Sequence, residues 1–184
     1  MSKTALVTGA SEGIGAEFAK ILANLGYDLI LVARSEDKLN QLADRLRSEF
    51  EVNSAVIVAD LSKANAAQDL FQNVEEIGAK VDFLINNAGL LQNGFFTKLS
   101  LKKQEAMISV NVMALTSLTH LFANKMALQG SGHILNVASL AGWMGIPNQN
   151  VYAASKAYVV SFSQALSNEM IAANSGVQVT ALCP

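Results

Sequence analysis

The sequence has few residues of the types that build disulfides, metal cages or charged binding surfaces. Cys183 is the single cysteine, so an internal disulfide is excluded and a zinc cage is disfavoured. The two histidines, His120 and His133, leave little for a metal site, and we expect none. Only 15% of the 184 residues are charged, and 13 basic against 15 acidic side chains give a net charge of −2, which indicates no nucleic-acid partner.

Long apolar runs are also missing from the sequence. No run approaches the roughly 18 residues of a membrane-spanning helix. The apolar stretch after Lys3 is too short for a signal peptide. We therefore expect no membrane partner and a cytoplasmic location. The hydrophobic fraction of 51% is nonetheless high, which excludes a disordered chain and supplies the core of one domain, residues 1–184.

Short runs rich in Val, Ile and Leu alternate with longer segments of helical spacing. The runs span Thr4–Thr8, Asp28–Ala33, Ser54–Ala59, Val81–Asn86, His133–Val137 and Val177–Leu182. Apolar residues on both faces of a run are typical of strands buried on both sides in a parallel sheet. The two longest helical segments cover Leu101–Leu128 and Val151–Ala173. This alternation predicts an α/β fold, a doubly wound parallel sheet with helices on both faces.

The first predicted strand leads through a glycine-rich turn into a helix. Gly9, Gly13 and Gly15 allow a tight turn and a close backbone approach to a pyrophosphate, which the N–H groups at the helix start would bind. The spacing is Gly-x-x-x-Gly-x-Gly rather than Gly-x-Gly-x-x-Gly, and the lysine of a nucleotide-hydrolase P-loop is absent. The alternative is a glycine-rich connection that holds no ligand.

The end of the second predicted strand bears on the choice between NAD and NADP. An acidic residue there accepts a hydrogen bond from the ribose 2′-hydroxyl, whereas an arginine holds a 2′-phosphate. Ala33 leaves the acidic position empty and Arg34 supplies a cation, which favours NADP(H) over NAD(H). Glu12, in the glycine turn, opposes this interpretation because its carboxylate would repel a nearby phosphate. The alternative for Arg34 is a solvated residue after a strand.

Tyr152 and Lys156 lie four residues apart, on one face of a predicted helix. A phenol exchanges protons poorly at neutral pH because its ordinary pKa is about 10, and a nearby ammonium stabilises the phenolate. Ser139, after the fifth predicted strand, is placed to hold a carbonyl oxygen beside the phenol. Taken alone, such a Tyr–Lys pair is usually a surface pair.

These motifs follow one another in a fixed order along the chain. The glycine turn, Asn86-Asn87-Ala88-Gly89, Asn111, Ser139 and Tyr152-x-x-x-Lys156 together resemble the short-chain dehydrogenase/reductase family, from Lys3 to Pro184. The resemblance implies a Rossmann-type fold and an oxidoreductase that interconverts a carbonyl and a secondary alcohol by hydride transfer with NADP(H).

The resemblance also implies a role for each matching residue. Asn111 holds a water in a proton relay, and Ser139 polarises the substrate oxygen. Tyr152 is the general acid/base, and Lys156 binds the nicotinamide ribose and favours the phenolate. With Arg34 added, the expected cofactor-binding residues are Gly9, Ser11, Gly13, Ile14, Gly15, Arg34, Asp60, Leu61, Asn87, Ala88, Gly89, Tyr152, Lys156 and Pro184.

Family members continue beyond the position that matches Pro184, so we expect this chain to be a fragment without the segment that covers the substrate. The loops 90–99 and 143–147 are apolar, which indicates either a hydrophobic substrate end or packing against that segment. The sequence around Leu29–Leu39 and Phe162–Glu169 is most similar to the family branch with broad-substrate and 3-oxoacyl or steroid-type reductases, which implies a substrate of that type. The family pairs the helices 101–128 and 151–173 between subunits, which implies a homodimer or homotetramer.

The alternative function is a catalytically silent nucleotide-binding or regulatory protein of the same fold. A serine hydrolase is disfavoured, because we expect no Gly-x-Ser-x-Gly nucleophile elbow and because the two histidines show no partner arrangement.

Overall fold

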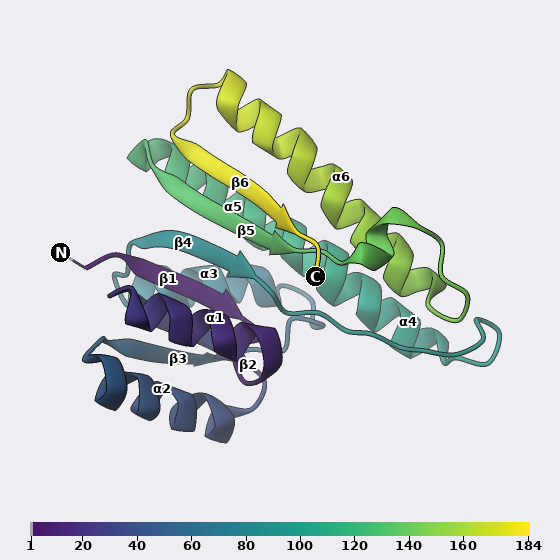
Figure 1. Ribbon diagram of the computed structural model, residues 1–184, viewed down its shortest axis with the longest axis horizontal. Coiled ribbons are helices and arrows are strands. Elements are labelled where there is room, and N and C mark those ends of the chain that lie inside the picture. Colours follow the sequence, from purple (N-terminus) through teal and green to yellow (C-terminus); the bar gives the residue numbers. More distant parts are fainter. Residues whose placement is uncertain (1) are drawn as a thin grey trace.

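Strands and helices alternate along the chain in the computed structural model, which describes residues 2–184 (Figure 1). The strands are β1 (Thr4–Thr8), β2 (Asp28–Ala33), β3 (Ser54–Val58), β4 (Val81–Asn86), β5 (Gly132–Val137) and β6 (Val177–Leu182). The helices are α1 (Gly13–Asn24), α2 (Glu36–Phe50), α3 (Ala66–Glu76), α4 (Leu101–Ile108), α5 (Leu115–Gln129) and α6 (Asn150–Ala172). The predicted strands match these bounds except that β3 ends one residue earlier and β5 begins one residue earlier.

All six strands form one parallel sheet in the order β3-β2-β1-β4-β5-β6. The order runs outward in both directions from the neighbouring pair β1 and β4, which confirms the predicted doubly wound fold. Chain segments that leave β1 and β4 diverge to opposite sides, so a crevice opens at the carboxyl ends of these two strands. This topology places the glycine turn after β1 beside Asn87 and Ala88 after β4.

Helices cover both faces of the sheet because consecutive strand residues are apolar and point to opposite faces. α1 and α2 lie on one face, and α3, α5 and α6 pack on the other (Figure 1). In β1, Leu6 packs toward α3 and α5 whereas Val7 packs toward α1 and α2. Leu84 and Ile85 in β4 divide in the same way, as the period of two in a strand requires.

The segment Leu101–Gln129 is a nearly continuous helix in which a π-helical stretch, Ser109–Ala114, joins α4 to α5. Among residues 2–184 it is the one helix long and apolar enough, by length and composition alone, to cross a membrane, with a mean hydropathy of 1.5 over 18 residues. The expectation that no segment reaches this threshold is therefore wrong. Half of that window is buried, and Leu118, Phe122 and Met126 belong to the core beneath the sheet. These contacts are those of a core helix.

Candidate active site

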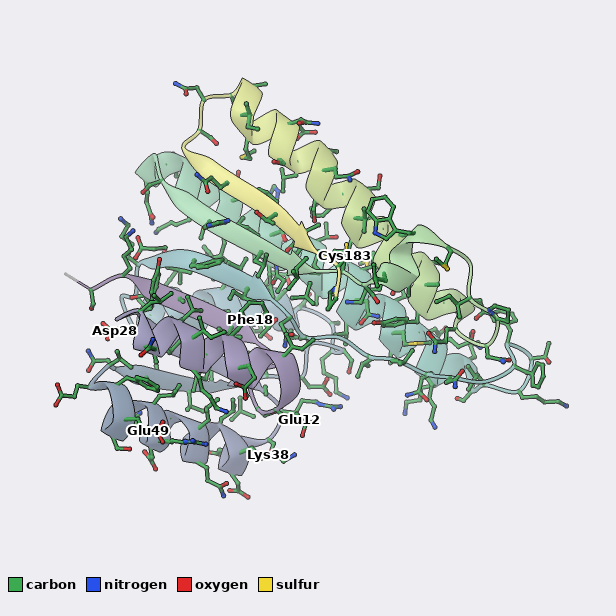
Figure 2. All side chains as sticks on the ribbon, in the orientation of Figure 1. Glu12, Phe18, Asp28, Lys38, Glu49 and Cys183 are labelled. Atoms are coloured by element: carbon green, nitrogen blue, oxygen red, sulfur yellow. The ribbon has the colours of Figure 1, made fainter. Side chains whose placement is uncertain are left out.

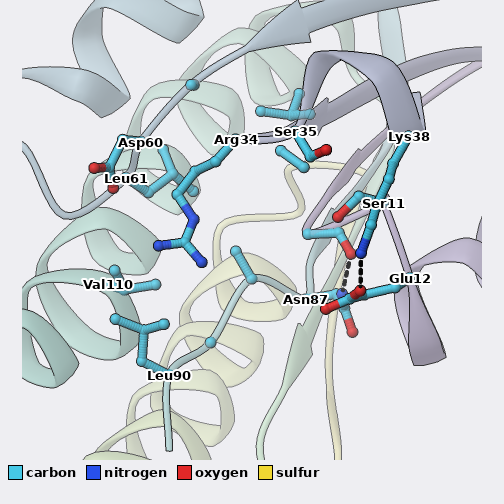
Figure 3. A pocket seen from close by; sticks show the side chains of 16 residues that line it. Ser11, Glu12, Arg34, Ser35, Lys38, Asp60, Leu61, Asn87, Leu90 and Val110 are labelled. Atoms are coloured by element: carbon cyan, nitrogen blue, oxygen red, sulfur yellow. Dashed lines mark hydrogen bonds and ion pairs between the residues drawn. The ribbon is translucent and has the colours of Figure 1, made fainter. Parts of the chain in front are cut away.

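A cleft of about 620 Å³ opens at the carboxyl edge of the sheet, where the strand order reverses (Figure 3). Segments that follow β1, β2, β3 and β4 supply most of its wall. The expected cofactor-binding residues that line it are Gly9, Ser11, Arg34, Asp60, Leu61, Asn87, Ala88 and Gly89. The other expected residues lie outside this lining; they are Gly13, Ile14, Gly15, Tyr152, Lys156 and Pro184.

The glycine turn brings the backbone after β1 into contact with the backbone after β4. Gly9 has a φ of +66°, which favours glycine, and a Cβ there would lie 2.9 Å from the Cα of Ala88. A Cβ on Gly15 would overlap the carbonyl oxygen of Gly9. Around Gly13 there is open space, although its φ is +58°. The turn thus exposes backbone at the start of α1, as an anion at a helix N-terminus requires.

Thr8 fixes this arrangement, and sequence reasoning missed it. Its buried hydroxyl accepts hydrogen bonds from the backbone N–H groups of Asn87 and Ala88, both at 3.0 Å. The Asn87 side chain donates in return to the carbonyl oxygens of Thr8, at 3.0 Å, and Gly9, at 3.2 Å. The only sequence signal for Thr8 is a polar residue that ends an apolar run. The two strand ends that form the crevice are therefore tied to each other.

Asn111 lies in the π-helical stretch and is fully buried. Its carboxamide oxygen accepts from the N–H of Leu90 at 2.8 Å, and its nitrogen donates to the Leu90 carbonyl at 2.9 Å. The same nitrogen donates to the hydroxyl of Ser155 on α6 at 3.0 Å. The side chain thus holds the cleft wall at Leu90 against the helix that carries Tyr152 and Lys156. π-Helical turns are frequent at functional sites.

Lys156 is a buried cation, with 4% of its surface exposed. Its ammonium donates to the carbonyl oxygen of Val137 at the end of β5, at 2.7 Å, and lies 5.8 Å from the centre of the Tyr152 ring. Burial lowers the pKa of Lys156 to about 8, while the nearby Cys183 acts in the opposite direction. Figure 2 shows Cys183 at the carboxyl end of β6. A buried ammonium with a carbonyl partner can bind further acceptors, such as hydroxyls.

Ser139 follows β5 and begins the short 3-10 helix Leu140–Trp143. Its hydroxyl oxygen accepts from the N–H of Ala141 at 3.2 Å, which leaves the hydroxyl proton free for another acceptor. A Cβ on Gly142 would lie 2.8 Å from the carbonyl carbon of Lys156, so the Ser139 segment packs directly on α6. Ser139, Tyr152 and Lys156 therefore come from two elements in close contact.

Gly89 is the point where this group meets the cleft. A Cβ there would lie 3.5 Å from the Asn111 side-chain oxygen and 3.6 Å from the Lys156 nitrogen. Gly89 also lines the cleft. Lys156 thus stands at one end of the cleft, and Arg34 belongs to the wall farther along.

Arg34 shares its part of the wall with Asp60 and Leu61 (Figure 3). The pKa of Asp60 lies below its ordinary value, chiefly because the Ser62 hydroxyl donates a hydrogen bond to the carboxylate at 2.7 Å. Burial opposes this shift, and the nearby Arg34 charge adds to it. Glu12 is not a free charge, because its carboxylate pairs with Lys38 on α2 at 2.6 Å. That contact with Lys38 lowers the pKa of Glu12. Sequence reasoning missed Lys38, because nothing in the sequence indicates that it pairs with Glu12.

The two apolar loops meet beside the first turns of α6. A second cavity, of about 640 Å³, is lined by residues 142–147 and by Asn150, Ala153, Ala154 and Ala157 of α6. The N–H of Gly94 donates to the carbonyl of Asn148 at 2.9 Å, which joins this loop to the loop 90–99. Phe95, Phe96 and Trp143 are exposed on the two loops.

The expectation of no Gly-x-Ser-x-Gly elbow is wrong, because the glycine turn contains Gly9-Ala10-Ser11-Glu12-Gly13, the pattern of a hydrolase nucleophile. A hydrolase would require a histidine beside Ser11. His133 instead stacks on Phe83 and contacts Thr180, while His120 contacts Asn124 on α5. Residues 2–184 contain no group of three or more His, Cys, Asp or Glu side chains that could hold a metal ion.

Several known proteins are similar to this chain in sequence and in fold. The profile of the short chain dehydrogenase family matches residues 3–184. An acetoacetyl-CoA reductase of Acinetobacter sp. is 38% identical over 183 residues, which cover 97% of this chain and 73% of that protein. Ketoacyl reductase HetN of Nostoc sp. is 35% identical over 182 residues, or 99% of this chain and 62% of that protein. A short-chain dehydrogenase from Sphingobium yanoikuyae, solved in complex with NADPH, is 38% identical with a TM-score of 0.93, over 99% of this chain and 70% of that one.

Proposed function

Because the chain belongs to the short chain dehydrogenase family of oxidoreductases, we propose that it reduces a carbonyl group to a secondary alcohol with NADPH. One observation carries the proposal. The buried ammonium of Lys156 lies 5.8 Å from the ring of Tyr152, at the end of a cleft whose wall includes Arg34. A proton donor at Tyr152 and a cation at Arg34 that suits a phosphate would then act in one site.

The cleft residues fit NADP(H). The glycine turn leaves open space around Gly13, the first residue of α1, and this suits a pyrophosphate at the helix N-terminus. Arg34 would hold the 2′-phosphate, and Ala33 offers no carboxylate that would repel it. Asp60 would lie beside the adenine, and Lys156 would hold the nicotinamide ribose.

The protein's part in the reaction is to hold the substrate oxygen and to supply a proton. When bound, NADPH supplies the hydride for the carbonyl carbon. The Ser139 hydroxyl, oriented by the Ala141 N–H, donates to the substrate oxygen as negative charge develops there. Tyr152 gives its phenolic proton to that oxygen, and the Lys156 ammonium stabilises the resulting phenolate. Asn111 keeps α6 in register with the cleft wall through Ser155 and Leu90.

The substrate class that we propose is a 3-oxoacyl thioester or a similar carbonyl compound with an apolar tail. Two relatives bear the names acetoacetyl-CoA reductase and ketoacyl reductase. In addition, exposed Phe95, Phe96 and Trp143 lie on the loops next to α6, where an apolar tail would find partners.

Turnover tests the proposal. The chain is mixed with NADPH and acetoacetyl-CoA, and the loss of NADPH absorbance is followed. We expect measurable turnover in the wild type and at least about a hundredfold loss in Tyr152→Phe, which keeps the ring but lacks the proton. NADPH binding without turnover, on this and a panel of ketones, would instead support the catalytically silent alternative.

We also propose that two copies associate through the long helix Leu101–Gln129 and α6. Met113 and Leu128 are 63% and 89% exposed on the long helix, and Ile108 is 45% exposed. Tyr158 of α6 makes a 2.8 Å hydrogen bond to Thr116 of the long helix, so the two helices present one surface. Apolar side chains on one such surface are typical of subunit interfaces.

A further inference from the structure

Charged side chains of both signs gather where the cleft approaches the start of α2. Arg34 and Lys38 are the cations, and Glu12 and Asp60 are the anions (Figure 3). All four line the cleft, so the two signs balance along its wall. The proposed function uses Arg34 and Asp60 but leaves the pair formed by Glu12 and Lys38 without a role.

The two anions differ in how firmly their charge is held. Asp60 accepts from the hydroxyl and the backbone N–H of Ser62, at 2.7 and 3.1 Å, within its own loop. Glu12 depends on Lys38, which reaches it from another element at 2.6 Å. The side chains of Lys38 and Glu12 are 54% and 73% exposed. Exposed ion pairs are weak because water and salt compete for both partners, so Lys38 can change partner at little cost.

Lys38 lies in the first turn of α2, four residues after Arg34, and both residues line the same cleft. A phosphate monoester carries up to two negative charges and three acceptor oxygens, whereas the Glu12 carboxylate carries one charge. A phosphate held by Arg34 would therefore attract the Lys38 ammonium more strongly than Glu12 does. A cofactor that lacks this phosphate would leave the ion pair as it is.

Resting on the proposed NADP(H) function, we propose that Lys38 is a second contact for the 2′-phosphate and that Glu12 is its built-in competitor. When NADPH binds, Lys38 leaves the Glu12 carboxylate and pairs with the phosphate. Arg34 and Lys38 together then determine the preference for NADPH over NADH. Glu12 weakens the binding of NADPH because its ion pair with Lys38 must open first.

Fluorescence titration with NADPH and NADH tests this exchange in Lys38→Met, Glu12→Gln and the double variant. We expect Lys38→Met to weaken NADPH about tenfold and to change NADH less than about twofold. Glu12→Gln should tighten NADPH about threefold or more, and clearly more than it tightens NADH. In the double variant, Glu12→Gln should tighten NADPH no more than it tightens NADH, because Lys38 is no longer there for Glu12 and the phosphate to compete for.

The matched control is Lys20→Met, which opens another exposed pair, with Glu17, at the same 2.6 Å on α1. Lys20 and Glu17 do not belong to the cleft lining. Equal NADPH affinities for Lys38→Met and Lys20→Met would overturn the proposal, and so would independent effects of Glu12→Gln and Lys38→Met. A wild-type chain that binds neither dinucleotide would show instead that the proposed function itself fails, and this inference with it.

Discussion

At the scale of single residues, the energetics of the site centre on the buried ammonium of Lys156. Burial favours the neutral amine, which is why the pKa of Lys156 falls to about 8. Its Val137 partner is a neutral carbonyl and offsets only part of the lost hydration. The side chain therefore destabilises the free protein at neutral pH. Hydrogen-bond acceptors that bind beside the ammonium would offset part of this cost.

Replacing Lys156 with Met should stabilise the chain by about 1–3 kcal/mol at pH 7. In the unfolded chain a lysine has its ordinary pKa of about 10.4, so between about pH 8 and 10 the unfolded state binds more protons than the folded state. Wild-type stability gains from this group as the pH rises through that window, and the advantage of Lys156→Met should shrink accordingly. Urea unfolding of both chains at pH 7 and at about pH 10 measures the difference.

The control for this prediction is Lys125→Met, which removes an exposed lysine paired with Glu75. Its difference from the wild type should stay nearly constant over the same range. A pH-independent difference for Lys156→Met would show that the ammonium carries no burial penalty.

Site residues could be predicted from the sequence where they directly follow a predicted strand. Arg34 and Gly9 follow strand ends, and their place in the cleft wall agrees with that reasoning. Thr8 and Lys38 were not predicted, because their partners are far away in the sequence. Thr8 contacts Asn87, 79 residues away, and Lys38 contacts Glu12, 26 residues away. A polar residue at the end of an apolar run carries no sign of which backbone groups it will satisfy.

At the scale of elements, the strands could be predicted nearly to the residue because burial on both faces leaves a continuous apolar run. The long helix was predicted only in outline. Its π-helical stretch, Ser109–Ala114, has no sequence signal; it coincides with the place where the Asn111 side chain contacts Leu90 and Ser155. The same tertiary contacts give Asn111 its structural importance.

Asn111→Ala should destabilise the chain by about 2–4 kcal/mol. The substitution removes hydrogen bonds to both backbone groups of Leu90 and to Ser155, and it leaves a void in a fully buried position. Asn124→Ala is the comparison, since its side chain contacts His120 on an exposed helix face and should change stability by less than about 0.5 kcal/mol. Similar urea midpoints for the two variants would contradict this role of Asn111.

At the scale of the whole molecule, the site lies at the boundary between two halves of one sheet. β1, β2 and β3 with α1 and α2 build the wall that carries the glycine turn and Arg34 (Figure 1). β4 and β5 with the long helix and α6 supply Asn111, Ser139, Tyr152 and Lys156. Hydrogen bonds between Thr8 and Asn87 connect the two halves, so motifs that are far apart in the sequence lie next to each other at this boundary.

The exposed apolar surface of the long helix Leu101–Gln129 and α6 should make the chain a dimer at micromolar concentration. Light scattering after size exclusion should give about twice the 19.5 kDa mass of one chain. A double substitution, Met113→Glu with Tyr158→Glu, should shift the protein to one copy, because it places like charges on the proposed interface. A wild-type chain that elutes as a monomer would refute the proposed association.

The measurement that tests the central claim most directly is a fluorescence titration of the wild-type chain with NADPH and, in parallel, NADH, repeated on Arg34→Ala. We predict saturable binding of both dinucleotides, with NADPH bound about tenfold or more tightly and that preference largely lost in Arg34→Ala. No saturable binding of NADPH, or equal affinities for the two dinucleotides in the wild type, would contradict an NADP(H) site in this cleft.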